Sequence, residues 1–576
     1  MRPLIEAGAN KLPMNNAPQV QTPRTGGQIV VDALLQHGVD TAFTVPGESF
    51  LPILDALHDA RESVRLIVCR HESPASHMSE AYGKLTGKPG ICLVTRGPGA
   101  TQASIGVHTA AQDSTPMILL VGQVNSQYLG REAWQEIDVA RVFGPIAKWA
   151  TQIERVQDIP AVMREAFHIA TSGRPGPVVI AMPEDILYEQ AIVSDVEPQP
   201  RVPALASAAQ LTRLQEMLSR AARPLMILGG SGWSPASCDA MRQFIERFEL
   251  PVCTSFRRQD LFDNLHPQYA GSLGIGVAEQ LAQRVREADL ILAFGTRLGE
   301  TTTSEYQLLQ APRPVQTLVH MHSGADELGR VYQADLAIHA DMPAFAHALA
   351  QLQAQESKPW AQAVIAGHDD YLQTLAPTPM PGALNMAEVV TWLRQRLPAD
   401  SIITNGAGNY TSWVHRFYAW RQTQTQLAPI SGAMGYGVPA AIAAQVVYPQ
   451  RTVVCFAGDG CFLMSGQELA TVRQYKLPIV FIVVNNGMYG SIRMHQEMNF
   501  PGKVFATDLE NPDFVALAKA YGLHSALVEC TQDFAAAFEN AVNCGGAALL
   551  ELRIDPQAIT PRTTLAALRE KALRKS

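Results

Sequence analysis

The sequence predicts an α/β protein of three consecutive doubly wound domains, each with a parallel sheet covered by helices on both faces. Short apolar runs bounded by Gly or Pro recur along the chain, and stretches with helical periodicity separate them. Such runs are typical of parallel strands that are buried on both faces. Two proline-containing segments, 196–203 and 374–382, interrupt this pattern, so the 576 residues divide into three units.

The first unit is an N-terminal domain over residues 25–190. Residues 28–37 have helical periodicity, and the runs 91–94, 117–121 and 178–182 suit buried strands. Alternation of this kind favours strand–helix–strand units with parallel pairing.

The second unit is a central domain over residues 206–352, and the third is a C-terminal domain over residues 383–556. Residues 557–576 form a C-terminal tail whose basic helical stretch we expect on the surface. The clearest strand candidates of the two domains are 225–228, 290–294, 452–456 and 479–484.

Composition indicates a globular protein. Hydrophobic residues make up 47% of the chain and charged residues 17%, with a net charge of −8 and a pI near 6.0. This balance argues against nucleic acid as a partner. None of the eight cysteines forms a C-x-x-C pair, so we expect no disulfide framework.

No segment predicts contact with a membrane. Residues 1–24 contain no apolar core of signal-peptide type, and we expect them to be a flexible tail. The longest strongly apolar run, 479–484, is too short to cross a bilayer. A cytoplasmic location is the simplest expectation.

The sharpest motif is GDG at 458–460, which closely follows one apolar strand. The next strand ends in the pair NN at 485–486. Glycines at a strand end let backbone N–H groups approach phosphate oxygens, and Mg²⁺ prefers oxygen ligands with few carboxylates when it also binds phosphate. Asp459 and Asn486 are therefore candidate ligands at one sheet edge. Two ordinary turns between strands and helices are the alternative.

The whole unit GDGCFLMSGQELATVRQYKLPIVFIVVNN resembles the signature of thiamine diphosphate-dependent enzymes. The resemblance implies that Mg²⁺ is bound by Asp459, Asn486 and the backbone oxygen of Met488. It also implies diphosphate contacts from Gly460 and Cys461. The family often has Ser where Cys461 stands, and a backbone contact would survive that change.

The second motif is Arg70-His71-Glu72, which follows a strand-like run and precedes a helical stretch. A carboxylate at this point is expected to be partly buried, although a capping or surface glutamate is the alternative. The stretch RHESPASHMSEAYGKLTGKPGICLVTRGPGATQ resembles the N-terminal domain of the acetolactate synthase-like group, whose large subunit is catalytic. The resemblance implies that Glu72 hydrogen-bonds N1′ of the cofactor aminopyrimidine and activates the cofactor.

The segment SGAMGYG at 431–437 is similar to the family loop that holds the cofactor bent. Met434 would separate the two cofactor rings, and the carbonyl of Gly432 would accept a hydrogen bond from the 4′-amino group. Plain core packing is the alternative for Met434. The resemblance, which covers about residues 25–552, implies pyrimidine-binding, central and diphosphate-binding domains. It also implies a homodimer or homotetramer, because one cofactor bridges domains of two subunits.

Further positions matching the family supply the remaining candidates. Pro46, Gly408 and Asn409 are cofactor-binding candidates, although the usual Gln-His pair is missing beside Gly408. Gln135 is a second catalytic candidate. The substrate candidates are Ser49, Trp134, Arg493 and His495, for which packing roles remain open. The motif DSTP at 113–116 matches without an assigned role, and Glu48 departs from the family glycine.

The central domain departs from flavin-containing relatives. Where these carry Arg-Phe-Asp-Asp-Arg, the chain has GTRLGE at 295–300, and only Arg297 keeps its place. FAD therefore remains an open possibility, and we expect a central domain that serves as scaffold without it.

The resemblance favours a Mg²⁺-dependent decarboxylating carboligase that uses a 2-oxo acid, such as pyruvate, and a second carbonyl acceptor. The alternatives are a 2-oxo acid decarboxylase, a 2-hydroxyacyl lyase and a non-catalytic relative. The paired histidines of the pyruvate decarboxylase type are not evident, since 105–109 offers one His.

Overall fold

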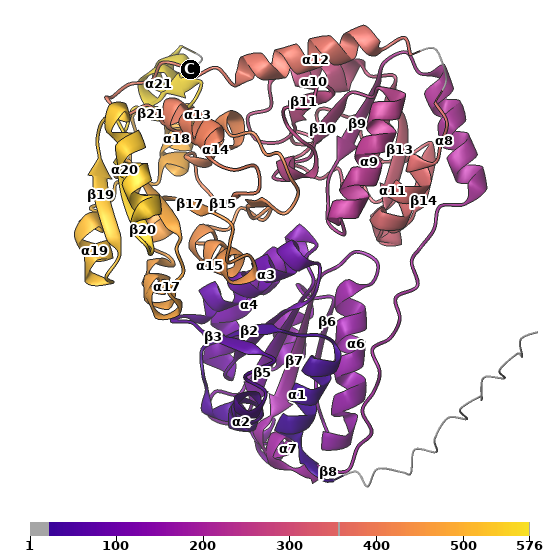
Figure 1. Cartoon of the computed structure of the whole chain (residues 1–576), viewed down its shortest axis with the longest axis vertical. Helices are drawn as coiled ribbons and strands as arrows, with labels where there is room; N and C mark the ends of the chain where they lie inside the picture. The colour runs from indigo at the N-terminus through magenta and orange to yellow at the C-terminus, as the bar shows by residue number, and fades with distance from the viewer. Residues whose placement is uncertain (1–21, 355–357, 575–576) are drawn as a thin grey trace, which may run out of the picture.

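The computed structural model describes residues 22–354 and 358–574. Figure 1 shows three α/β bodies, each built on a six-stranded sheet. All strand pairs within these three sheets are parallel, which confirms the predicted fold class. The predicted N-terminal tail falls outside the described residues up to residue 21, and Arg24 begins the first strand.

The N-terminal sheet has the strand order β3-β2-β4-β5-β7-β6. Its strands are β2 (Thr41–Thr44), β3 (Arg65–Val68), β4 (Gly90–Val94), β5 (Met117–Gln123), β6 (Trp149–Gln152) and β7 (Pro177–Pro183). Its helices are α1 (Gly26–Gln36), α2 (Leu51–Asp59), α3 (Glu72–Thr86), α4 (Gly97–Asp113), α5 (Val139–Phe143), α6 (Ile159–Thr171) and α7 (Glu184–Tyr188). Short 3-10 turns lie at Glu48–Phe50, Ser126–Tyr128 and Val156–Asp158.

Both faces of this sheet are covered, as a doubly wound fold requires. In β4, Ile91 and Leu93 pack against α1, α2 and α6, whereas Cys92 and Val94 pack against α3 and α4. Successive strand residues point to opposite faces, so an uninterrupted apolar run is needed where both faces are buried.

The central sheet has the order β11-β10-β9-β12-β13-β14. Its strands are β9 (Pro224–Leu228), β10 (Val252–Thr254), β11 (Tyr269–Ser272), β12 (Leu290–Phe294), β13 (Thr317–His322) and β14 (Leu336–His339). Its helices are α8 (Ala208–Arg220), α9 (Pro235–Phe248), α10 (Glu279–Glu287), α11 (Met342–Ala350) and α12 (Ala361–Thr374), with 3-10 turns at Gln259–Leu261 and Ala325–Glu327.

The C-terminal sheet has the order β16-β15-β17-β18-β20-β19. Its strands are β15 (Ile402–Asn405), β16 (Gln426–Leu427), β17 (Val453–Gly458), β18 (Val480–Asn485), β19 (His524–Val528) and β20 (Ala548–Arg553). Its helices are α13 (Met386–Arg396), α14 (Thr411–Phe417), α15 (Gly437–Val447), α16 (Asp459–Phe462), α17 (Leu469–Tyr475), α18 (Gly490–Asn499), α19 (Phe514–Ala520) and α20 (Thr531–Asn543), with a 3-10 turn at Gly466–Glu468.

Two small antiparallel pairs complete the chain. They are β1 (Arg24–Thr25) with β8 (Gln190–Ala191), and β21 (Ala558–Thr560) with β22 (Thr563–Thr564), which leads into α21 (Leu565–Leu573). Helix α21 packs on α18 and is mostly exposed. No helix in the described part of the chain combines the length and apolar character that a bilayer crossing requires.

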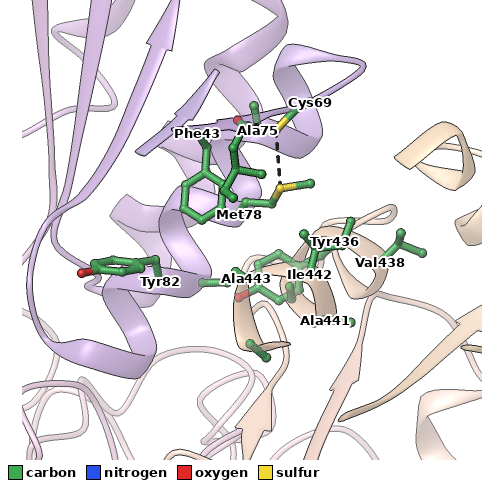
Figure 2. Packing of buried hydrophobic residues seen from close by; sticks show 14 of the residues in the cluster. Phe43, Cys69, Ala75, Met78, Tyr82, Tyr436, Val438, Ala441, Ile442 and Ala443 are labelled. Carbon is green, nitrogen blue, oxygen red and sulfur yellow. Dashed lines mark hydrogen bonds between the residues drawn. The ribbon is translucent and has the colours of Figure 1, made fainter. Parts of the chain in front are cut away.

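The N-terminal and C-terminal domains share one hydrophobic core where α3 packs on α15. Figure 2 shows Met78 of α3 close to Tyr436, Ile442 and Ala443 of the facing segment. Most residues of α15 are small, and every one from Gly437 to Val446 is buried. Small side chains let the two helices approach closely, so replacing Met78 by Ala would cost about 2–5 kcal/mol of stability.

Candidate functional site

A cavity of about 220 Å³ lies where β15, β17 and β18 end. The loops after these strands form its walls, together with the loop 428–436 between β16 and α15. Open α/β sheets bind ligands at this edge. All nine cofactor-binding candidates of the C-terminal domain line it: Gly408, Asn409, Gly432, Met434, Asp459, Gly460, Cys461, Asn486 and Met488.

Asp459 is the only carboxylate in the lining that the structure describes, and its exposed fraction is 3%. Its Oδ1 accepts a hydrogen bond from Gly460 N at 2.8 Å, and its Oδ2 accepts from Gly487 N and Asn511 Nδ2, both at 2.9 Å. Burial raises the pKa of Asp459, and these donors offset part of that effect. Among the described residues no basic side chain forms an ion pair with it, and Arg493 of α18 pairs with Glu497 and Asp508 instead.

The oxygen atoms near Asp459 fit Mg²⁺. Asn486 and Met488 lie on the turn that follows β18, and Asn486 Oδ1 accepts from Met488 N at 3.3 Å. Within the described ranges, no group of three or more His, Cys, Asp or Glu side chains is suited to a metal ion. A single carboxylate with amide and carbonyl oxygens suits a Mg²⁺ ion that completes its shell with phosphate and water.

Asn511 is a site residue that sequence reasoning missed. The segment 507–511 pairs with 487–489 through Tyr489 N to Thr507 O and Leu509 N to Gly487 O, both at 2.8 Å. This pairing lets Asn511 Nδ2 donate a hydrogen bond to Asp459. The Oδ1 atom of Asn511 is buried without a hydrogen-bond partner among the described groups. No motif marks Asn511, because it reaches the site through pairing of loops.

Glycine is required in the GDG loop for space. A Cβ at Gly458 would lie 2.9 Å from the Tyr410 ring, and one at Gly460 would lie 2.6 Å from the Tyr489 ring. Both rings line the same cavity. At Gly458 and Gly460 the backbone therefore lies too close to these rings for any residue with a Cβ atom.

Cys461 contacts two other segments of the chain at the cavity. Its Sγ accepts from Gly435 N at 3.1 Å and from Tyr410 Oη at 3.5 Å. Burial raises the pKa of Tyr410 well above its usual value, so the hydroxyl keeps its proton. The thiol is thus engaged within the protein, in keeping with a backbone contact between Cys461 and a ligand.

The C-terminal segment also reaches the cavity. Ala558 and Ile559 of β21 line it, and Ile559 packs with Met488 and Leu565. We assigned these residues to a tail because the sequence around them shows neither a buried-strand pattern nor a motif.

The candidates of the N-terminal domain do not line this cavity. They gather instead around the ends of β2, β3 and β4, and they are Pro46, Ser49, Glu72, Trp134 and Gln135. Ser49 Oγ lies 2.9 Å from Thr95 Oγ1, and the carbonyl of Gln135 accepts from Gly97 N at 2.8 Å.

Glu72 is the first residue of α3 and is half-buried. The turn before it is fixed from the C-terminal domain, since Glu468 Oε1 accepts from Arg70 N at 2.9 Å and from His71 N at 3.1 Å. His71 Nδ1 accepts from Ser73 N at 3.1 Å and caps the helix. The side chain of Glu72 therefore starts from a well-defined backbone position.

Arg96 is a second residue that sequence reasoning missed. Its guanidinium pairs with Glu48 at 3.3 Å and Glu184 at 2.7 Å, and it lies 6.0 Å from the ring centroid of Trp134. Glu48 is thus both exposed and ion-paired, and Trp134 is 71% exposed. The departure at Glu48 was the available signal, because a charged side chain there calls for a partner of opposite charge.

Arg493 and His495 lie on α18 and do not line the cavity. Arg493 pairs with Glu497 at 3.3 Å and Asp508 at 3.2 Å, so its charge is already matched by two carboxylates. His495 is exposed. Their predicted substrate role stays a prediction.

Arg297, the remnant of the flavin motif, faces the N-terminal domain. Its Nη2 donates to the carbonyl of Gln112 at 3.1 Å. This contact gives Arg297 a role between domains, and the expectation that flavin is absent stays a prediction.

Comparison with known families identifies all three domains. Residues 24–142 match the thiamine pyrophosphate enzyme N-terminal TPP binding domain, 211–349 the central domain and 406–552 the C-terminal TPP binding domain. Thiamine pyrophosphate and thiamine diphosphate are the same compound.

Whole-chain relatives agree with these matches. The acetolactate synthase large subunit of Parasynechococcus marenigrum is 35% identical, over 88% of this chain and 83% of its own. The acetolactate synthase isozyme 2 large subunit of Escherichia coli is 32% identical over 92% and 95%, and the large subunit from Lactococcus lactis is 32% identical over 88% of each chain. The chain therefore belongs to the thiamine diphosphate-dependent enzymes, in their acetolactate synthase-like group.

Proposed function

We propose that this enzyme is a Mg²⁺-dependent decarboxylating carboligase that joins a 2-oxo acid to a second carbonyl compound. The observation that carries the proposal is the cavity at the C-terminal sheet edge, lined by all nine residues predicted there for the cofactor and its metal. When bound, thiamine diphosphate supplies a thiazolium ring that accepts the electron pair left as CO₂ departs. The similarity to acetolactate synthases favours bond formation as the next step.

The C-terminal domain would bind the diphosphate end of the cofactor. Asp459, Asn486 and the carbonyl of Met488 would hold Mg²⁺, whose remaining sites are left for phosphate oxygens and water. Backbone groups of the GDG loop and of Gly408 and Asn409 would contact the diphosphate. The proposal assigns the aminopyrimidine contacts to Gly432 and the separation of the two rings to Met434.

The N-terminal domain would supply the activating acid and the substrate contacts. Glu72 would hold a proton at N1′ of the aminopyrimidine, Gln135 would lie near the reacting carbon, and Pro46 would contact the cofactor. Ser49 and Trp134 would contact the substrate. These residues gather on a different sheet edge from the cavity, which supports a site assembled from two chains.

A homodimer is then the smallest active assembly, and a homotetramer contains two such pairs. In a C2 dimer each N-terminal domain would face the partner's C-terminal domain, and two equivalent sites would form. One chain by itself would bind the cofactor without activating it.

The first test is the reaction of purified protein with pyruvate, thiamine diphosphate and Mg²⁺, with CO₂ and products measured by mass spectrometry. Acetolactate supports the carboligase. Acetaldehyde as the only product would instead identify the enzyme as a simple 2-oxo acid decarboxylase. If neither forms, the same assay with other 2-oxo acids and with 2-hydroxyacyl substrates tests for another donor and for a lyase, and failure of all of them contradicts the proposal.

The two-chain site is tested by co-expressing Glu72→Gln and Asp459→Asn chains with different tags. Each variant alone is expected to be inactive. In a mixed dimer one site would combine the intact Glu72 of one chain with the intact Asp459 of the other, so about a quarter of the activity should return in a random mixture. If both residues serve the same chain's site, mixing restores nothing.

A further inference from the structure

The loop 428–436, which carries Gly432 and Met434, is held by side chains from the other two domains. Asp113, the last residue of α4, has an exposed fraction of 2%. Its Oδ2 accepts from Ile430 N at 3.1 Å and its Oδ1 accepts from Ser431 N at 3.2 Å. Both bonds end directly before Gly432, which lines the cofactor cavity.

Two buried side chains of α3 support Asp113. Lys84 Nζ donates to Asp113 Oδ2 and, at 3.3 Å, to the carbonyl of Ala428 at the start of the same loop. Lys84 also lies 3.4 Å from Glu80 Oε1, and Glu80 Oε2 accepts from Tyr436 Oη at 2.5 Å at the end of the loop. The loop is thus held at its beginning, middle and end.

The charges of Lys84, Asp113 and Glu80 match each other although their side chains are largely buried. Burial by itself would lower the pKa of Lys84, but Asp113 and Glu80 beside it raise that pKa above its usual value. Lys84 therefore keeps its charge in this largely buried position. Thr115 Oγ1 donates to Glu80 Oε1 at 2.7 Å and Tyr436 donates to Oε2, so both oxygens of this carboxylate have partners.

The central domain reaches the same loop through Arg257. This residue is 5% exposed, and its Nη1 donates to the carbonyl of Pro429. Its Nε is buried without a partner among the described groups. A hydroxyl pair adds a further contact, between Thr109 Oγ1 and Ser431 Oγ at 3.3 Å.

Stability alone is a weak reason for such a cluster. Apolar residues of similar volume often join buried surfaces at least as well as a buried ion pair does, whereas charged groups fix one relative position. Helices α3 and α15 already supply apolar packing beside the cluster, as Figure 2 shows for Met78 and Tyr436. The polar groups are directed at backbone atoms of 428–431, the segment that sets where Gly432 lies.

We propose that Asp113, with Lys84 and Arg257, is a positioning residue that fixes the 428–434 backbone for thiamine diphosphate. It rests on the proposed function, since Gly432 and Met434 are the cofactor contacts it would place. Asp113 does not line the cofactor cavity and would act through the loop. The DSTP motif at 113–116 thereby gains a role, because Asp113 holds the loop and Thr115 holds Glu80.

The test is Asp113→Asn, with the dissociation constant for thiamine diphosphate measured by isothermal titration calorimetry at a fixed excess of Mg²⁺. An amide keeps one acceptor oxygen and loses the other, so one loop N–H loses its bond. We expect about tenfold weaker binding, which is the effect of losing one charge-assisted hydrogen bond. The melting temperature of the cofactor-free protein is measured in parallel.

Asp40→Asn is the matched control. Asp40 Oδ1 accepts from Tyr82 Oη of α3 at 2.8 Å, and Tyr82 lies about 200° around the helix from Glu80 and from Lys84, which make the loop contacts. This variant makes the same change from Asp to Asn at a side chain that contacts the same helix. We expect its cofactor affinity to equal that of the unaltered protein.

Several results would overturn the inference. One is Asp113→Asn binding the cofactor within about twofold of the unaltered protein, even with a lower melting temperature, because only a structural role would then remain. Equal weakening by Asp40→Asn is another. If Asp113→Asn does not fold, Arg257→Met removes the donor to Pro429, and unchanged affinity there also overturns it. If the unaltered protein binds no cofactor, the proposed function fails as well.

Discussion

The carboxylate of Glu468 accepts a hydrogen bond from the backbone N–H of Arg70, at 2.9 Å across the boundary between the N-terminal and C-terminal domains. The same Oε1 accepts from His71 N at 3.1 Å, and Thr471 Oγ1 donates to the other oxygen at 2.6 Å. Glu468 is fully buried, and burial raises its pKa. The residue after these two N–H groups is Glu72, so the C-terminal domain fixes the backbone that carries the proposed activating acid.

Glu468→Ala should therefore lower turnover more than it lowers cofactor affinity. Two buried N–H groups would lose their acceptor, and the turn before Glu72 would shift. We expect kcat to fall about tenfold or more, with the dissociation constant for thiamine diphosphate changed by less than about threefold. Glu468→Gln keeps an acceptor oxygen and should restore most of the activity. Equal losses in both variants would contradict this account.

Glu72→Gln should nearly abolish turnover while the protein still binds thiamine diphosphate and Mg²⁺. The amide has the size of the carboxyl group but cannot exchange a proton with N1′, and we expect a loss of more than about a hundredfold in kcat. Steady-state kinetics and calorimetric titration measure the two effects separately. Glu62→Gln, at a side chain that is 91% exposed, is the control. Unchanged turnover in Glu72→Gln would remove the assigned role.

Asp459→Asn should abolish the Mg²⁺ dependence of cofactor binding. The substitution removes the only carboxylate among the described residues that line the cavity. We expect affinity for thiamine diphosphate to fall more than about a hundredfold, to the level of the unaltered protein treated with EDTA. Added Mg²⁺ should restore cofactor binding to the EDTA-treated unaltered protein but not to Asp459→Asn. Asp533→Asn, at an exposed position on α20, serves as control.

Gly460→Ala tests the close approach of the GDG backbone. The added Cβ would lie 2.6 Å from the Tyr489 ring, so the loop or the ring must move. We expect about tenfold weaker cofactor binding without loss of the fold. Gly546→Ala adds the same atom where no other atom lies within 4 Å and should have no effect. Similar affinities for both variants would show that the loop has more space than the structure gives it.

Glu497 links α18 to the C-terminal helix α21. Hydrogen bonds from Arg569, the first of them 2.7 Å long, lower its pKa from 4.5 to about 2, with Gly502 N at 3.0 Å adding to the effect. Because folding lowers this pKa, the stabilisation is complete above 4.5 and is lost as the pH falls toward 2.

Glu497→Gln should therefore lower the free energy of unfolding by roughly 2 kcal/mol near neutral pH, after allowance for the partial exposure of Arg569. Thermal unfolding of the two proteins at a series of pH values measures it. The difference should be constant between about pH 6 and 8 and shrink below about 4.5. Glu570→Gln, on the exposed side of α21, should change little. A difference that grows on acidification would contradict the assignment.

Residues close together in the sequence were predictable because local patterns determine them. The strands predicted at 452–456 and 479–484 are confirmed as β17 and β18, since a run buried on both faces of a parallel sheet must be apolar throughout. The GDG and NN motifs follow those strands directly, so their meeting at one sheet edge follows from parallel pairing. The family resemblance then supplied the expected roles.

Contacts between distant segments could not be predicted in this way. Asn511 reaches Asp459 through pairing of two loops, and Ile559 reaches the cavity from beyond the last strand of the sheet. Neither position carries a pattern, because a single side chain in a loop or short strand has no period that a sequence can display.

The sequence by itself determined three parallel α/β domains, the GDG loop with its metal-ligand candidates, and the cofactor class. These depend on side-chain period and on motifs within one strand–loop–helix unit. Only the tertiary structure decided that Asp113, Lys84 and Arg257 converge on the loop of Gly432, and that Glu468 fixes the turn before Glu72. Those relationships join three domains, and their geometry follows from how α3, α4 and α15 pack, which no local pattern encodes.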